Sequence, residues 1–463
     1  MSSSPSQLSE PPVESTSAVD ELDGAVLTSP AGIAPETTDP SKSSLYRIVW
    51  RWHFYAGLFV SPILLAAAVT GALYVFHAEL SDGLYADLRF VEPVGMRLSY
   101  DEQRQAVLQA AGGTEPEYLT VWPGANRATQ WIAHRHEGGD ANPEQRHQVI
   151  YIDPYSGEVL GTQIMEEEFF HAVLDLHRTL FAGPTGRVVV ELATSWGLVL
   201  LITGAYLWWP RNKNRIRGVW IPRWKAKPYV VLRDLHAVCG IYVLAFAAIV
   251  LATGLFVSQV WGTGYMLASV QAGQSLGDFF ANAESEPPGE NAVPASLETA
   301  VSSVLAHRRS GEILHFGLAA TPTQAWKAYL MHDDDTNAVR GFDVDQYTGK
   351  LISVTETAEL TPMVRILALA VSLHQGKTFG LSSKIVAFVT CLALIGMIVT
   401  GLWMWWKRRP DGGFGFPQRP RSAVVPKWVW LIVALVGVSL PTVGVSMLLI
   451  VAGERFVRRG DRD

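Results

Sequence analysis

Four histidines in this chain form two pairs, and the residues around each pair repeat along the sequence. His53 and His236 stand 183 positions apart, and each is followed by glycine four residues later and by Thr-Gly seventeen residues later. An ionisable side chain inside a membrane is usually functional, and imidazole is a common metal ligand. The spacing therefore predicts a duplicated unit that binds a metal ion or haem. The residues in register are His53, Gly57, Thr70 and Gly71 in the first copy and His236, Gly240, Thr253 and Gly254 in the second.

The second pair, His177 and His374, stands 197 positions apart. Each is followed by glycine six residues later, then by Thr-Gly and by a pair of tryptophans. A lone histidine of this kind could be a polar residue at a helix end, and tryptophans often form a belt at the membrane surface. Two pairs with matching glycines favour ligands over that alternative. The residues in register are Gly183, Thr203, Gly204, Trp208 and Trp209 in the first copy and Gly380, Thr400, Gly401, Trp405 and Trp406 in the second.

Long apolar stretches place the chain in a membrane. The hydrophobic fraction of the 463 residues is 49%, and a membrane-spanning helix needs about 20 apolar residues. Pro441 divides the last candidate stretch, which could then form a re-entrant hairpin, but we favour one kinked crossing. The five stretches cover residues 53–76, 188–209, 236–258, 384–406 and 428–452.

The charge distribution predicts the orientation of these spans. The loops after the second and fourth stretches are rich in lysine and arginine, whereas the long segments at about 81–170 and 262–362 are rich in acidic residues. The positive-inside rule puts the basic loops in the cytoplasm and both long segments outside. We interpret the basic loops as topology signals and expect no nucleic-acid partner.

The two outside segments also resemble each other. Each contains the pattern Asp-x-Tyr-Ser/Thr-Gly between apolar residues, beginning at Asp153 and at Asp345. Asp and Ser/Thr can bond to a turn backbone and glycine accepts positive φ, so the pattern predicts a β-hairpin. Two small α+β domains are therefore expected. Their predicted helices cover 100–111 and 297–307, and their predicted strands include 117–121, 130–134 and 326–331.

Taken together, these motifs resemble the PepSY-associated transmembrane family, whose members are also called iron-regulated membrane proteins. The resemblance covers about residues 45–455. It implies a multi-pass protein of the bacterial inner membrane with PepSY-like outside domains, and the family includes di-haem reductases of ferric siderophores. The matching segments are His53-x-x-x-Gly57, His236-x-x-x-Gly240, Leu176-His177-Arg178, Leu207-Trp208-Trp209-Pro210-Arg211, the fourth-span counterpart of the last two, and both Asp-x-Tyr turns.

The expected fold class is an α-helical integral membrane protein. It has two tandem repeats of span, PepSY-like α+β domain and span, plus a fifth C-terminal span. The expected parts are a disordered cytoplasmic tail (1–44), the first span (45–80), a periplasmic domain (81–168), an edge helix with the second span (169–210), a basic cytoplasmic loop (211–232), the third span (233–260), a second periplasmic domain (261–362), an edge helix with the fourth span (363–407), a second basic loop (408–427) and the fifth span (428–455).

The depth of each histidine in the membrane predicts how two b-type haems are held. His53 and His236 begin outward-going spans and would ligate a cytoplasmic-side haem iron, while His177 and His374 would ligate an outer-side haem iron. Glycine leaves room for a flat ring, although these glycines could equally serve close helix packing. Gly57 and Gly240 lie one helical turn from their histidines. Gly204 and Gly401 should line the cytoplasmic haem, and Gly71 and Gly254 the outer one.

The remaining histidines give weaker signals. His77 and His171 could lie beside the outer haem or belong to a substrate site. The histidines of the outside segments are typical surface residues. His134 and His136 could form a weak metal site, although their spacing alone says little.

The resulting functional hypothesis is a transmembrane electron conduit. Electrons from an unknown donor on the cytoplasmic side, or from quinol, would reach a ferric siderophore or another ferric chelate outside. Such a protein needs no acid–base pair, so we predict no catalytic residue of that kind. The alternative is a non-enzymatic PepSY membrane protein that binds a partner or modulates a protease, with structural histidines.

Overall fold

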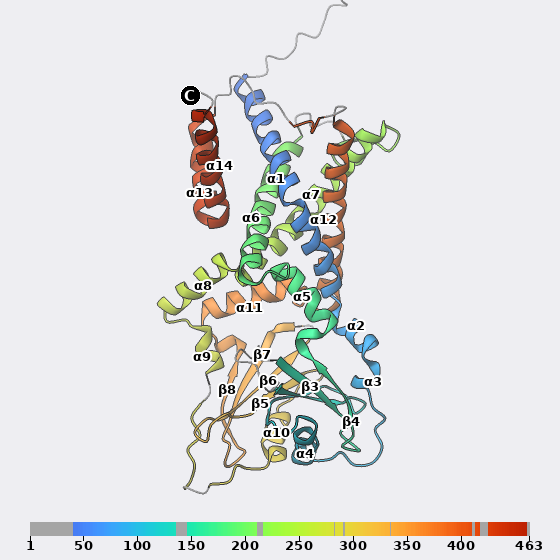
Figure 1. Cartoon of the computed structure of the whole chain (residues 1–463), viewed down its shortest axis with the longest axis vertical. Coiled ribbons are helices and arrows are strands. Elements are labelled where there is room, and N and C mark those ends of the chain that lie inside the picture. The colour runs from blue at the N-terminus through green and yellow to red at the C-terminus, as the bar shows by residue number, and fades with distance from the viewer. Residues whose placement is uncertain are drawn as a thin grey trace, which may run out of the picture.

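The computed structural model describes residues 40–135, 146–210, 216–281, 283–289, 292–333, 335–409, 413–416 and 425–460. Four long helices form a bundle, and a β-sheet lies at one end of it (Figure 1). We call this end of the bundle the sheet-side end and the opposite one the far end. The predicted tail, residues 1–44, lies almost wholly outside the described residues.

The four long helices are apolar enough to cross a membrane. Their most apolar windows have mean hydropathies of 1.8 to 2.6, and each helix is at least 26 residues long. At about 1.5 Å per residue, such a helix exceeds the roughly 30 Å of a bilayer core. The protein is therefore a membrane protein. The helices are α1 (Pro40–Tyr74), α6 (Gly183–Trp208), α7 (Pro228–Gly254) and α12 (Leu381–Arg408).

Shorter helices lie across the sheet-side end of the bundle (Figure 1). The helix α5 (Phe169–Thr179) packs on α1 and α6, and α11 (Pro362–Gln375) packs on α7. Both precede a long helix in the chain, so their last turns reach into the bundle. The other linking helices are α2 (His77–Leu84), α3 (Ala86–Arg89), α8 (Val260–Gln271) and α9 (Leu276–Phe280).

The two long segments between the spans contribute to one eight-stranded antiparallel sheet. The strand order is β4-β3-β2-β1-β5-β6-β7-β8, and the halves join where Tyr118 of β1 pairs with Gly317 of β5. The predicted α-helical fold class is therefore wrong, because this sheet is a main part of the fold. The strands are β1 (Pro116–Val121), β2 (Thr129–Arg135), β3 (Arg146–Ile152), β4 (Val159–Ile164), β5 (Ile313–Gly317), β6 (Trp326–His332), β7 (Asp335–Val344) and β8 (Leu351–Glu356).

Two amphipathic helices, α4 (Tyr100–Ala110) and α10 (Leu297–Leu305), cover the middle of the sheet. They bury Tyr100, Val107 and Val301 against sheet residues such as Trp131 and Phe316. Removing this apolar surface from water stabilises the domain, by roughly 1.5–3 kcal/mol for each fully buried large side chain. Both predicted helices are confirmed within two residues of their ends.

The two predicted hairpin turns are confirmed. Asp153 accepts a hydrogen bond from the Tyr155 backbone N–H at 2.8 Å between β3 and β4, and Asp345 does the same for Tyr347 at 3.1 Å between β7 and β8. Gly157 and Gly349 follow with φ of +76° and +67°. Each glycine is required because a side chain is strained at such a positive φ.

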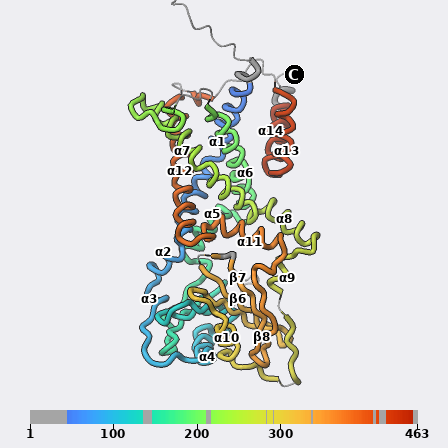
Figure 2. Tube along the Cα trace, turned by 180° about the vertical axis from the view of Figure 1, so that it is seen from behind, coloured from blue at the N-terminus to red at the C-terminus, as the bar shows by residue number. Residues whose placement is uncertain are grey.

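The C-terminal segment corrects the prediction of a fifth kinked crossing. It forms α13 (Lys427–Ser439) and α14 (Pro441–Gly460), which lie side by side as a hairpin, with the C-terminus near the far end (Figure 2). Thirteen residues in α13 rise only about 20 Å, which is short of a bilayer core. Pro441 begins the second helix, and Gly437 lies against Gly444, so the chain turns back instead of continuing.

Candidate functional site

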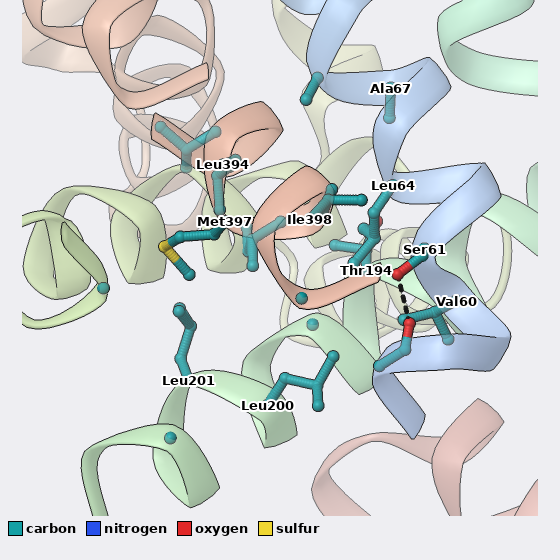
Figure 3. A pocket seen from close by; sticks show the side chains of 18 of the residues that line it. Val60, Ser61, Leu64, Ala67, Thr194, Leu200, Leu201, Leu394, Met397 and Ile398 are labelled. Atoms are coloured by element: carbon teal, nitrogen blue, oxygen red, sulfur yellow. Dashed lines mark hydrogen bonds between the residues drawn. The ribbon is translucent and has the colours of Figure 1, made fainter. Parts of the chain in front are cut away.

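A long internal cavity of about 980 Å³ runs through the four-helix bundle. Its volume lies at the upper end of the range for small-molecule and cofactor sites. Figure 3 shows part of its wall, where Leu64 of α1, Leu200 of α6, and Met397 and Ile398 of α12 contribute apolar side chains. The lining residues include the four predicted histidine ligands and the six predicted cofactor-binding glycines.

The first predicted pair meets in the part of the cavity nearer the far end. His53 comes from α1 and His236 from the first half of α7, so two long helices that are distant in sequence supply them. Their ring centroids lie 6.5 Å apart, and the ring planes are almost perpendicular at 89°. The two imidazoles therefore approach each other without stacking.

The second predicted pair meets at the sheet-side end. His177 lies in the last turn of α5 and His374 in the last turn of α11. Their ring centroids lie 6.0 Å apart with an interplanar angle of 51°. The residues that follow α5 and α11, Leu180 and Gly376, have φ of +53° and +69°, so each short helix stops shortly after its histidine.

The Nδ1 atom of each histidine is held by a neighbouring long helix. His177 Nδ1 lies 3.0 Å from the Ala67 carbonyl oxygen, and His374 Nδ1 lies 2.9 Å from that of Val250. His236 Nδ1 lies 2.9 Å from the Met397 carbonyl oxygen, and His53 Nδ1 lies 2.9 Å from Thr203 Oγ1. Because carbonyls only accept, the three contacts to carbonyls place the proton on Nδ1 and leave the Nε2 lone pair free.

The Thr-Gly motifs account for these contacts. Ala67, Val250 and Met397 each stand three residues before the threonine of a motif, and the Thr203 hydroxyl itself faces His53. Thr203 also donates to the Val199 carbonyl at 2.8 Å, which leaves its lone pair for the His53 N–H. Each histidine therefore meets the Thr-Gly motif of a helix from its own half of the chain.

The glycine of each motif lies beside the same imidazole. A Cβ atom on Gly71 would come within 3.3 Å of His177 Cε1, and one on Gly254 within 2.8 Å of His374 Cε1. Likewise, a Cβ on Gly204 would meet His53 at 3.3 Å, and one on Gly401 would meet His236 at 3.4 Å. Only at Gly254 is the approach too close for a Cβ atom without a shift, while at the other three glycines the imidazole would be in tight contact with it.

Gly57 and Gly240 line the cavity farther from the rings. A Cβ on Gly57 would have only Leu200 nearby, at 3.9 Å, and one on Gly240 would meet Met397 at 3.6 Å. The space beside Gly57 is therefore part of the cavity itself, whereas a packing role is more evident at Gly240.

The residues present fit a haem ligated by two histidines. Two imidazoles that share one metal ion through bonds of about 2 Å hold their centres roughly 6 Å apart. Both pairs show this separation, and no hydrogen bond to any of the four Nε2 atoms occurs among the described residues. A metal-bound histidine commonly donates its other ring N–H to a carbonyl or hydroxyl. The glycines and the cavity volume supply room for a flat ring.

Charged side chains line both ends of the cavity. Arg178, Arg187 and Lys377 lie at the sheet-side end, and Arg233 and Arg408 at the far end. Guanidinium groups commonly pair with carboxylates such as haem propionates. Near the far end, Asp234 is 1% exposed and accepts from Arg223 Nε at 2.7 Å and from Arg233 at 2.9 Å. The bond from Arg223 anchors the loop before α7 to the first turns of that helix.

An ion pair that the sequence did not predict lies at the sheet-side end of the cavity. Lys377 is 9% exposed and donates to Asp333 at 3.1 Å. Burial favours a higher pKa for Asp333, but the Lys377 ammonium outweighs it and lowers that pKa. His77 also lines the cavity, and burial together with Lys377 lowers its pKa. His171 is not among the lining residues. The run of three aspartates ending at Asp335 was the only sequence signal.

Comparisons with known proteins address the family of the chain. No curated protein is similar enough to this chain to count as a match. A family model, described as the PepSY-associated TM region, matches residues 50–408 and so covers α6, α7, α12, α1 from residue 50 on, the sheet and the four histidines. This chain therefore belongs to the family of membrane proteins with a PepSY-associated transmembrane region.

Proposed function

We propose that the protein binds two b-type haems and carries electrons across the bacterial inner membrane to a ferric chelate, such as a ferric siderophore. The observation that carries the proposal is the meeting of two histidine pairs at different depths of one cavity, each with its Nδ1 atoms held by backbone or threonine oxygens. Bis-histidine haem iron gains and loses one electron without exchanging ligands.

The chain's own residues have three tasks in this proposal. The histidines hold and orient the cofactors, with His53 and His236 as ligands of one and His177 and His374 as ligands of the other. The apolar wall around Leu200 and Met397 excludes water between the two pairs. The bonds to Nδ1 make the imidazoles stronger donors, which influences the reduction potentials.

The proposed direction follows from charge. The basic loops adjoin the far end, which we place in the cytoplasm with the start of α1, and the sheet then lies in the periplasm. A quinol or a reductase would supply one electron for each ferric ion reduced. We place the ferric chelate at the sheet-side end of the cavity, because Lys377 and Arg178 line the cavity there together with the second histidine pair.

An absorption spectrum of the purified, detergent-solubilised protein tests haem binding. We expect a Soret band that sharpens and shifts on reduction with dithionite, and about two haems per chain by the pyridine haemochrome assay. His177→Ala and His53→Ala should each lose about one haem. His307→Ala is the matched control, since His307 is exposed on the sheet domain. Colourless protein from haem-replete cells would overturn the proposal and favour the non-enzymatic alternative.

A second experiment tests the substrate class. Dithionite-reduced protein, freed of excess reductant, should be reoxidised on addition of a ferric hydroxamate chelate, with one ferrous ion trapped per electron released. Lys377→Gln should slow this step while leaving haem content unchanged. Reoxidation at equal rates by ferric chelates and by unrelated one-electron oxidants would argue against a dedicated ferric site.

A further inference from the structure

Three potential metal ligands come together on the sheet, away from the bundle cavity. They are Glu117 of β1, His134 of β2 and His147 of β3, which lie on three adjacent strands. One ligand atom from each lies within 4.8 Å of the other two. His134 and His147 are direct cross-strand partners, with ring centroids 5.0 Å apart. His136, the partner suggested by sequence spacing, lies outside the described residues.

A second carboxylate orients one of these imidazoles. Glu166, in the turn η1 (Met165–Glu167), accepts from His147 Nδ1 at 2.8 Å and also from the His147 backbone N–H at 3.1 Å. With its proton on Nδ1, His147 presents the Nε2 lone pair. In metal sites, a carboxylate commonly accepts the N–H of the ring nitrogen that does not bind the metal, and so fixes the orientation of the histidine.

The imidazole of His134 has a hydrogen-bond partner for only one of its two nitrogens in the described part of the chain. His134 Nε2 pairs with the Glu117 carboxylate, whereas its Nδ1 atom is buried and has no hydrogen-bond partner in the described part of the chain. A buried polar atom without a partner is rare in folded proteins. His134 and Glu117 are 27% and 36% exposed, so an ion can reach them from solvent.

The chemistry of this donor set selects a class of ion. Two imidazole nitrogens and one carboxylate suit Zn²⁺ and neighbouring divalent transition metals, while Mg²⁺ and Ca²⁺ prefer all-oxygen sites. Three protein ligands leave at least one position open for water or another ligand. A cation at this point would also offset the negative charge of the Glu117 and Glu166 carboxylates.

We propose that Glu117, His134 and His147 form a binding site for one divalent transition-metal ion, with Glu166 as the positioning residue of His147. The site lies at the end of the sheet that leads through η1 into α5, the helix that carries His177. It shares no residue with the four cavity histidines. The inference is therefore independent of haem binding.

Zinc binding to the full-length protein tests the site. Protein purified without a polyhistidine tag and stripped with chelator should take up one Zn²⁺ per chain in equilibrium dialysis followed by elemental analysis. His134→Ala, His147→Ala and Glu117→Gln should each weaken binding at least ten-fold, and Glu166→Gln about ten-fold. His307→Ala serves as the matched control and should bind as the wild type does.

The outcomes separate this site from the cavity. Haem content should stay unchanged in every variant, so failure of one proposal leaves the other standing. A measurement on unmutated protein guards against misfolded variants: Zn²⁺ but not Mg²⁺ should protect His134 and His147 from modification by diethyl pyrocarbonate, as seen by peptide mass spectrometry. Equal zinc binding by wild type and the three ligand variants, or no protection of either histidine, would overturn the assignment.

Discussion

Gly254 lies against the imidazole of His374 so closely that a Cβ atom on Gly254 would come within 2.8 Å of His374 Cε1. Its counterpart Gly71 leaves more room, since a Cβ there would lie 3.3 Å from His177 Cε1. The two halves of the chain therefore hold equivalent histidines with different tolerance for a methyl group.

This difference predicts unequal effects of alanine. Gly254→Ala must displace His374 or α7, because interiors are close-packed and carbon atoms do not approach to 2.8 Å. We expect this variant to retain about one haem per chain, whereas Gly71→Ala should retain two with a small spectral shift. Gly83→Ala is the control, because nothing lies within 4 Å of a Cβ placed there. Equal haem content in all three variants would contradict the assignment of Gly254 to the site.

Two threonines of the Thr-Gly motifs, Thr203 and Thr253, should differ in their influence on the reduction potential. The Thr203 hydroxyl lies 2.9 Å from His53 Nδ1, whereas the Thr253 hydroxyl bonds only to carbonyls of its own helix. Thr203→Val removes the acceptor of the His53 N–H and makes that imidazole a weaker donor, so ferric haem is less stabilised. We expect one of the two midpoint potentials to rise, on the order of tens of millivolts.

The matched variant Thr253→Val keeps the bond from His374 Nδ1 to the Val250 carbonyl. Spectroelectrochemical titration should therefore show both of its potentials close to those of the wild type. If the two valine variants shift the potentials equally, the hydroxyl contact to His53 is not what sets the difference.

The histidines and glycines that line the cavity could be named from the sequence, whereas the continuous eight-stranded sheet could not. The histidines, glycines and threonines repeat at fixed offsets, so their side chains could be recognised without coordinates. The acceptors for three of the four Nδ1 atoms are backbone carbonyls, at Ala67, Val250 and Met397. A carbonyl exists at every position and leaves no trace in the sequence, so helix packing had to show which ones serve.

The errors in the predicted fold have specific physical causes. The sheet is continuous because β1 pairs with β5, about 200 residues later in the chain, and pairing between distant edge strands carries no local signal. The pairing of His134 with His147 was missed for a related reason, since it depends on the cross-strand register. The fifth crossing was predicted from summed hydropathy, which does not reveal that Pro441 starts a second helix.

The salt bridges of Asp82 predict a pH dependence of the sheet domain. Asp82 binds Arg127 at 2.6 Å and Arg89 at 3.1 Å. Burial favours a higher pKa for Asp82, but hydrogen bonds from Arg127 and Arg89 outweigh it and lower that pKa. The stabilisation is thus complete above the ordinary aspartate pKa, near 4, and is lost as the pH falls through the lower folded-state pKa.

The Asp82 prediction can be checked by thermal unfolding. Asp82→Asn should lower the unfolding temperature at pH 7 by a few degrees and should flatten its dependence on pH below about 4. Glu115→Gln is the matched control. Glu115 pairs with Arg104 but is 61% exposed, and such surface ion pairs contribute little to stability. If the unfolding temperature of Asp82→Asn falls with pH below about 4 as steeply as that of the wild type, other carboxylates govern acid unfolding.

The C-terminal hairpin predicts on which side of the membrane the chain ends. Because α13 is too short to cross and α14 returns beside it, the end of α14 should face the same compartment as the basic loop before α7. Reporter fusions after residue 460 and within residues 216–226 should therefore behave alike: fluorescent with a protein that matures only in the cytoplasm, and inactive with a periplasmic phosphatase. A fusion between β1 and β2 should show the opposite pattern. Opposite behaviour of the first two fusions would establish a fifth crossing.

The packing of α13 on α14 should depend on Gly444, where a Cβ atom would collide with the Gly437 backbone. Gly444→Leu should therefore separate the two helices. Gly453→Leu should not, because nothing lies within 4 Å of a Cβ atom placed there.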